Sequence, residues 1–137
     1  MRILIDSNII LSAALFSEGK VSRVLFHILE AHTIIIASYS LQECSTVFKK
    51  KFPDKSQCLK EFLEKIEYER FETPSRLDPY DYPSIRDVHD LPILASAILS
   101  DADLLLTGDK DFSVVKVKKP LIFTPSHYFE LMNNPKD

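Results

Sequence analysis

Short apolar runs alternate along this chain with longer segments in which apolar residues recur at helical spacing. We read the apolar runs as strands, the third of them weak, at 2–6, 33–37, 69–72, 103–106 and 121–123. The periodic segments predict helices at 8–16, from Val21 to Leu29, and at 40–51, 56–68, 91–99 and 126–132. Strands that alternate with helices favour a parallel sheet covered on both faces. The predicted fold is therefore α/β, a three-layer α/β/α sandwich around a central, mainly parallel five-stranded sheet.

The length and composition are those of one soluble domain. The chain has 137 residues, 45% of them hydrophobic and 27% charged, which is enough for a single buried core. Neither a repeat nor a linker interrupts it, so we expect a single domain over 1–137, with a proline-bearing loop at 73–86. Asp6 breaks the first apolar run, which argues against a signal peptide, and no run is long enough to cross a membrane. Cys44 and Cys58 fit no disulfide framework and suggest a reducing, cytoplasmic location.

Two further properties narrow the function. Only two glycines occur, which excludes the glycine-rich loops that cradle phosphates in nucleotide-binding folds. The net charge is only −3, so any nucleic-acid site must be a local patch rather than an overall basic field.

Four acidic residues lie where an open parallel sheet would gather them. Asp6 closes the first apolar run, Asp109 follows the run 104–106, and Glu43 and Asp90 lie near the starts of helical segments. Ligands of open α/β sheets bind outside the carboxyl ends of the strands. Carboxylates crowded there repel one another unless a cation or a proton relieves them, and Mg²⁺ and Mn²⁺ prefer oxygen ligands of this kind. The pattern predicts a metal-dependent site for phosphodiester chemistry.

Each acid also has a purely structural explanation. Glu43 would close a capping box with Ser40, bonding back to the Ser40 amide. A helix N-cap suits Asp90 or, one turn earlier, Asp87. The acids that follow strands can accept amides from the turns they begin. A helix start favours one carboxylate but does not require four to converge, so the combination favours a site.

Four segments of the sequence, taken in order, resemble the acidic motifs of PIN-domain proteins, namely 3–13, 38–43, 87–95 and 106–112. The first holds a hydrophobic strand followed by the Asp-x-Asn pattern of Asp6 and Asn8. One such motif is weak, but four in the right order over almost the whole chain are specific. The chain is most similar to the short, single-domain VapC-like ribonuclease toxins of toxin–antitoxin pairs.

That resemblance implies a Mg²⁺- or Mn²⁺-dependent endoribonuclease that cuts single-stranded or loop RNA and leaves 5′-phosphate and 3′-hydroxyl ends. By motif, Asp6, Asp90 and Asp109 would be metal ligands, and Glu43 would bind metal or orient the attacking water. Lower-ranked supporting residues are Asn8, Asp87, Thr107 and Asp111. The resemblance also implies an antitoxin protein as partner and a homodimer.

Substrate contacts are less distinct in the sequence. Basic residues cluster at 49–51 and again at Lys116, Lys118 and Lys119, where they could hold an RNA backbone. A solvated helix end explains 49–51 equally well. Aromatic residues that could stack on bases, but for which packing in the core or a loop is the commoner role, are Tyr80, Tyr82 and Phe112.

Other functions remain open at this point. Phosphatases of the haloacid-dehalogenase type need a second Asp two residues after the first, and this chain has Asn8 there. The acidic pattern of a response-regulator receiver is missing as well. A nuclease of RNA maturation that is not a toxin fits equally well. A non-catalytic PIN-like binding module would work without metal and would tolerate Asp6→Asn.

Overall fold

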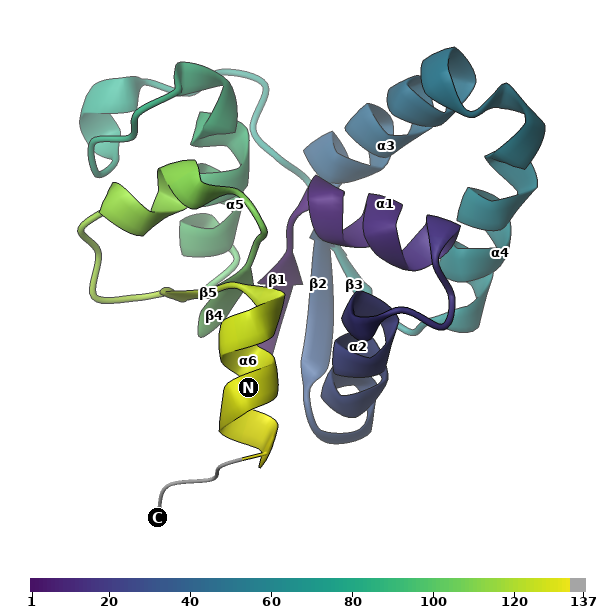
Figure 1. Cartoon of the computed structure of the whole chain (residues 1–137). Coiled ribbons are helices and arrows are strands. Elements are labelled where there is room, and N and C mark those ends of the chain that lie inside the picture. Colours follow the sequence, from purple (N-terminus) through teal and green to yellow (C-terminus); the bar gives the residue numbers. More distant parts are fainter. Residues whose placement is uncertain (134–137) are drawn as a thin grey trace.

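The fold is a five-stranded, fully parallel sheet with helices on both faces (Figure 1). The computed structural model describes residues 1–133. The strands, in the spatial order β3-β2-β1-β4-β5, are β1 Arg2–Ile5, β2 Thr33–Ala37, β3 Glu69–Phe71, β4 Leu104–Leu106 and β5 Leu121–Phe123. The predicted fold class is confirmed, and each predicted strand is present within one residue at either end.

Six α-helices lie in the described part of the chain. They are α1 Ser7–Leu15, α2 Lys20–Ala31, α3 Ser38–Lys51, α4 Ser56–Lys65, α5 Leu91–Leu99 and α6 Pro125–Asn133. Short 3₁₀ helices lie in the connections at η1 Pro53–Lys55, η2 Pro79–Asp81, η3 Val88–Asp90 and η4 Lys110–Val114. The predicted helix 56–68 was too long at its end, because the backbone turns extended at Ile66.

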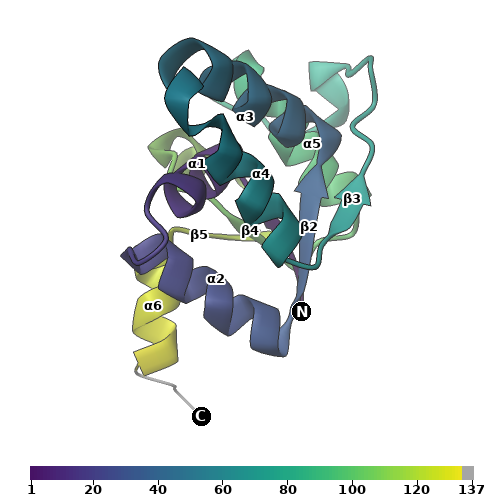
Figure 2. The same cartoon turned by 90° about the vertical axis from the view of Figure 1, so that its right-hand side faces the viewer.

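The two faces of the sheet are buried in two separate clusters, as strand geometry requires. Alternate residues of a strand point to opposite faces. In β1, Ile3 and Ile5 join the cluster under α1, α2, α4 and α6, whereas Leu4 joins the cluster under α5 and η4. Figure 2 views the molecule from the side of α2 and α4. Both faces are covered at the centre of the sheet, so β1, β2 and β4 are almost continuously apolar, whereas the edge strand β3 is Glu69-Arg70-Phe71.

The strand order reverses next to β1. The chain builds β1, β2 and β3 outward on one side, then crosses over and places β4 and β5 on the other side. β1 and β4 pair in parallel with Ile5 opposite Leu106, so the residues that follow these two strands emerge side by side. This is the position at which open α/β sheets bind their ligands.

No helix among residues 1–133 is both long and apolar enough to span a membrane. Both cysteines are free, with Cys44 buried and Cys58 partly exposed. Burial raises the pKa of the Cys44 thiol to about 12, which leaves it protonated at neutral pH.

Candidate functional site

Asp6 lies directly after β1, at the carboxyl edge of the sheet, and is only 6% exposed. Its Oδ1 accepts from the Ser7 N–H at 2.6 Å, and its Oδ2 accepts from the Thr107 hydroxyl at 2.7 Å. Burial raises the pKa of Asp6, the charges of Glu43 and Asp109 raise it further, and the two hydrogen bonds oppose this rise. The predicted turn-capping role is therefore present, and it coexists with a crowded acidic environment.

Hydrogen bonds join the start of α1 to the loop that follows β4, around Asp6. The Asp109 N–H donates to Thr107 Oγ1 at 3.0 Å, and the Gly108 N–H donates to Asn8 Oδ1 at 3.1 Å. The amide nitrogen of Asn8 lies 3.5 Å from Asp6 Oδ2. Asn8 and Thr107 thus link the start of α1, next to Asp6, to the loop that carries Asp109.

The carboxylate of Asp90 has the fewest contacts that would offset its negative charge. It is half-buried, and its Oδ2 is buried without a hydrogen-bond partner among the described residues. Burial and, after it, the charges of Asp109, Asp87, Asp6 and Asp111 raise its pKa to about 6. Its side chain makes no capping bond to α5, so the N-cap explanation of its carboxylate is wrong. A buried acceptor without a donor is rare and calls for a ligand or a proton.

Asp87, Asp90 and Asp111 come together as a group. Each offers a carboxylate oxygen, and these oxygens lie within 4.8 Å of one another. Asp87 caps η3 through the N–H of His89 and also contacts the His89 ring, which together lower its pKa. Arg86 Nη1 lies 3.5 Å from Asp111 Oδ1 and offsets part of the negative charge. Two residues ranked as supporting thus flank Asp90 directly.

The spacing of two pairs of acids in the sequence is consistent with this group. Asp87 is three residues before Asp90, one turn of helix away, and Asp111 is two residues after Asp109. Because Asp109 caps η4 by accepting the Asp111 N–H at 2.9 Å, the tight turn brings the two acids to the same edge. The sequence shows how far apart the acids are along the chain, but it does not show which of them lie nearest to Asp90 in space.

Glu43 is exposed on α3, and its predicted capping box is wrong. The helix begins at Ser38 rather than Ser40, so Ser40 lies within the first turn, and its buried hydroxyl has no partner among the described residues. Glu43 Oε2 instead lies 3.5 Å from the Tyr39 hydroxyl. The charge of Glu43 contributes to the raised pKa of Asp6.

The donor set fits a hard divalent cation. The site offers oxygen ligands, which hard divalent cations prefer. A bound cation would give the buried Oδ2 of Asp90 a partner and would lower the raised pKa values of Asp6 and Asp90. The described residues of the group include carboxylates and neither histidine nor cysteine, which suits Mg²⁺ or Mn²⁺ better than zinc.

The candidate substrate contacts divide between core and surface. Phe112 is 1% exposed and packs in the core, as predicted. Tyr80 is 96% exposed, so the prediction that it packs in the core or a loop is wrong. The basic run 49–51 forms the last turn of α3, where the helix dipole favours positive charge. A groove along α3 joins Glu43 to Lys50 and Lys51.

Comparisons with known proteins agree with this picture. The sequence pattern of the family described as PIN domain matches residues 2–111. No curated protein sequence matches the chain. Nine chains of solved structures match in fold. Among these structures is VapBC2 from Rickettsia felis bound to a DNA fragment from their promoter, with a TM-score of 0.69 and 19% identity over 90% of this chain and 98% of that chain.

Proposed function

The chain belongs to the PIN-domain family, and on that premise we propose that it is a metal-dependent endoribonuclease. PIN domains are generally nucleases and usually use divalent metals. The proposed reaction is hydrolysis of RNA phosphodiester bonds to 5′-phosphate and 3′-hydroxyl ends, with Mg²⁺ or Mn²⁺ as the cofactor.

The observation that carries this proposal is the carboxylate of Asp90. Its unpartnered Oδ2 lies in a group of carboxylates whose charges all disfavour ionisation, and its pKa is raised to about 6. Asp87 stabilises its turn as a cap, but Asp90 makes no such contact and its interactions with the neighbouring like charges are unfavourable. Positive charge bound at this group would relieve that repulsion.

We assign the cation to Asp90, with further oxygens from the acids on either side. The motif assigns Asp6 and Asp109, and the close grouping of carboxylate oxygens adds Asp87 and Asp111. The hydrogen bonds that Asp6 accepts leave lone pairs free, because a carboxylate can accept about four. A divalent cation bound there supplies activation of water and neutralisation of charge on the leaving oxygen.

The protein's own residues would carry the remaining tasks. Glu43 would orient the attacking water and take its proton, because it is exposed to solvent and its charge acts on the pKa of Asp6. The water oxygen bonds to phosphorus, the bond from phosphorus to the 3′ oxygen breaks, and that oxygen gains a proton from solvent. Thr107 holds Asp6 in the required rotamer through its 2.7 Å hydrogen bond.

The biological setting is also a proposal. The similar solved structure, VapBC2, is described as bound to a DNA fragment from their promoter, and this supports a toxin role with a cognate antitoxin protein as partner. We place the protein in the cytoplasm, as a homodimer, on the same family analogy.

The first test is cleavage of a mixed panel of single-stranded RNAs with Mn²⁺, Mg²⁺ or EDTA. We expect cleavage only with metal, 5′-phosphate ends by mass spectrometry, and loss of activity in Asp6→Asn and Asp90→Asn. Asp54→Asn makes the same chemical change at an exposed residue of η1 and should cut like the wild type. Cleavage in EDTA, or by Asp90→Asn, would contradict the proposal.

A further inference from the structure

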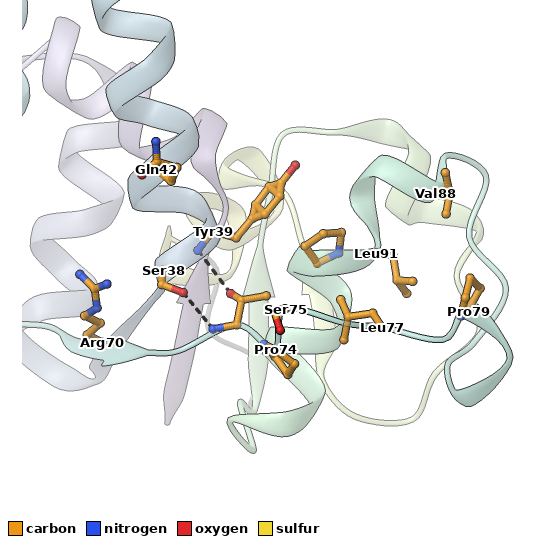
Figure 3. Close-up of a pocket in the computed structure, with 12 residues that line it drawn as sticks. Ser38, Tyr39, Gln42, Arg70, Pro74, Ser75, Leu77, Pro79, Val88 and Leu91 are labelled. Carbon is orange, nitrogen blue, oxygen red and sulfur yellow. Dashed lines mark hydrogen bonds between the residues drawn. The ribbon is translucent and has the colours of Figure 1, made fainter.

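A recess of about 650 Å³ lies next to the acidic site, between the start of α3, the loop after β3 and the start of α5 (Figure 3). Tyr39 and Gln42 line it from α3, Pro74 and Leu77 from the loop, and Leu91 from α5. The volume is within the range of pockets that hold small ligands.

The recess is built before any ligand arrives. Thr73, in the loop after β3, donates its N–H to Ser38 Oγ at 2.9 Å and accepts the Tyr39 N–H at 3.3 Å through its hydroxyl (Figure 3). The same hydroxyl lies 2.9 Å from the Ser96 hydroxyl, which is buried on α5. These bonds tie the loop to both helices, so the walls of the recess are fixed relative to one another.

The recess also shares a wall with the acidic site. Tyr39 lines it, and the Tyr39 hydroxyl lies 3.5 Å from Glu43 Oε2. Leu91, which lines the recess, follows Asp90 directly in the chain. A phosphodiester held at Asp90 would have its neighbouring nucleoside at the mouth of the recess.

The chemistry of the lining suits a nucleobase. Tyr39 offers an aromatic face, the rings of Pro74 and Pro92 offer further flat apolar surface, and Gln42 offers an amide that both donates and accepts. Single-stranded RNA is recognised by stacking on aromatic rings and by hydrogen bonds to base edges. The one cation of the lining, Arg70, lies at its end and is paired with Glu72, so the recess is suited to a neutral ring rather than to phosphate.

We propose that this recess binds the base of the nucleotide next to the cleaved bond, with Tyr39 stacking on it and Gln42 reading its edge. The inference rests on the proposed ribonuclease function, and it adds a source of sequence preference. The acids themselves contact only the phosphate backbone, which is the same in every RNA.

Base binding can be measured without cleavage. Adenosine, guanosine, cytidine and uridine are titrated in EDTA while the backbone amides of the ¹⁵N-labelled protein are followed by NMR. Neutral nucleosides avoid repulsion by the acids. We expect the largest shifts at Gln42, Ser75 and Leu77, with one base binding more tightly than the others. Gln42→Ala should weaken that base about two- to tenfold, as expected for one hydrogen bond.

The matched control is Gln57→Ala, which removes the same side chain from the exposed start of α4, away from the recess. The second measurement is cleavage of a randomised RNA with Mn²⁺. Gln42→Ala should flatten the base preference beside the cut, and Ser75→Tyr, which fills the recess with a ring, should lose it.

The outcomes separate this inference from the proposed function. Cleavage with the same base preference in wild type and both recess variants would overturn the inference and leave the ribonuclease intact. Nucleoside shifts that map elsewhere, or none for any base, would overturn it too. Nucleosides bound in the recess by a protein that cuts no RNA would support base binding and defeat the ribonuclease.

Discussion

At the scale of single residues, the site is defined by acids that the surrounding protein only partly relieves. Asp6 has hydrogen bonds from Ser7 and Thr107, and Asp87 has those of His89. Asp90 has no partner for Oδ2 among the described residues, and the charges of its acidic neighbours add to its burial. The negative charge on Asp90 is therefore a cost to the metal-free fold, and this cost depends on pH.

The change Asp90→Asn tests that cost. The pKa of Asp90 rises from an ordinary 3.8 to about 6 on folding, so the folded state holds its proton more tightly than the unfolded chain. Its contribution to stability is full below pH 3.8 and is lost as the pH rises to about 6. The corresponding free energy is about 3 kcal/mol, which partial exposure reduces to about 1–2 kcal/mol.

We therefore expect Asp90→Asn and wild type to have equal free energies of unfolding below about pH 4 in EDTA. Above about pH 6 the variant should be more stable by about 1–2 kcal/mol. Urea denaturation at a series of pH values measures both. A difference that stays constant from pH 4 to pH 7 would show that charge on Asp90 is not its cause.

At the scale of elements, the residue that caps the short helix η3, Asp87, has two separable roles. Asp87 caps η3 by accepting the His89 N–H at 2.9 Å, and it also contributes an oxygen to the group with Asp90 and Asp111. Capping needs only a short side-chain oxygen, whereas cation binding needs a carboxylate. The two functions can be separated by substitution.

Asp87→Ser keeps an oxygen that can cap η3 and removes the charge. We expect the urea midpoint in EDTA to stay at the wild-type value, because serine is as good an N-cap as aspartate. Binding of Mn²⁺, followed by calorimetry, should weaken by about tenfold or more. Asp87→Ala should lower the midpoint as well as the affinity. If Asp87→Ser binds Mn²⁺ as the wild type does, Asp87 only caps η3.

At the scale of the whole molecule, the site is where distant parts of the chain meet. Residues after β1, within α3, before α5 and after β4 all contribute acids to one edge of the sheet. A ligand that relieves this edge acts on the global free energy of unfolding, because the unfolded chain holds no such site.

Mn²⁺ or Mg²⁺ should therefore stabilise the fold. At a free concentration about a hundred times the dissociation constant, a single site adds about 2.7 kcal/mol to the free energy of unfolding. We expect an upward shift of the urea midpoint with either metal, and none with the same ionic strength of NaCl. Asp90→Asn should lose most of the shift, while Asp54→Asn should retain it. An equal shift in all three proteins would place the cation elsewhere.

The sequence by itself determined the layers and the edge. Short apolar runs such as 33–37 and 104–106 became parallel strands, because a chain that alternates them with amphipathic helices can bury both faces only in that way. Asp6 and Asp109 were placed at the carboxyl edge by the same logic, since each directly follows or nearly follows a buried strand. These features depend on local order and periodicity, which the sequence records.

Only the tertiary structure decided which groups touch. In the fold, Asp87 and Asp111 lie beside Asp90, Glu43 forms no capping box, and Tyr80 is exposed. The tertiary structure also formed the recess between α3, α5 and the loop after β3. Such contacts join residues far apart in the chain through crossovers and loops, and their distances depend on how the layers pack. A sequence gives the order of the acids along the chain, but their separation in space is set by that packing.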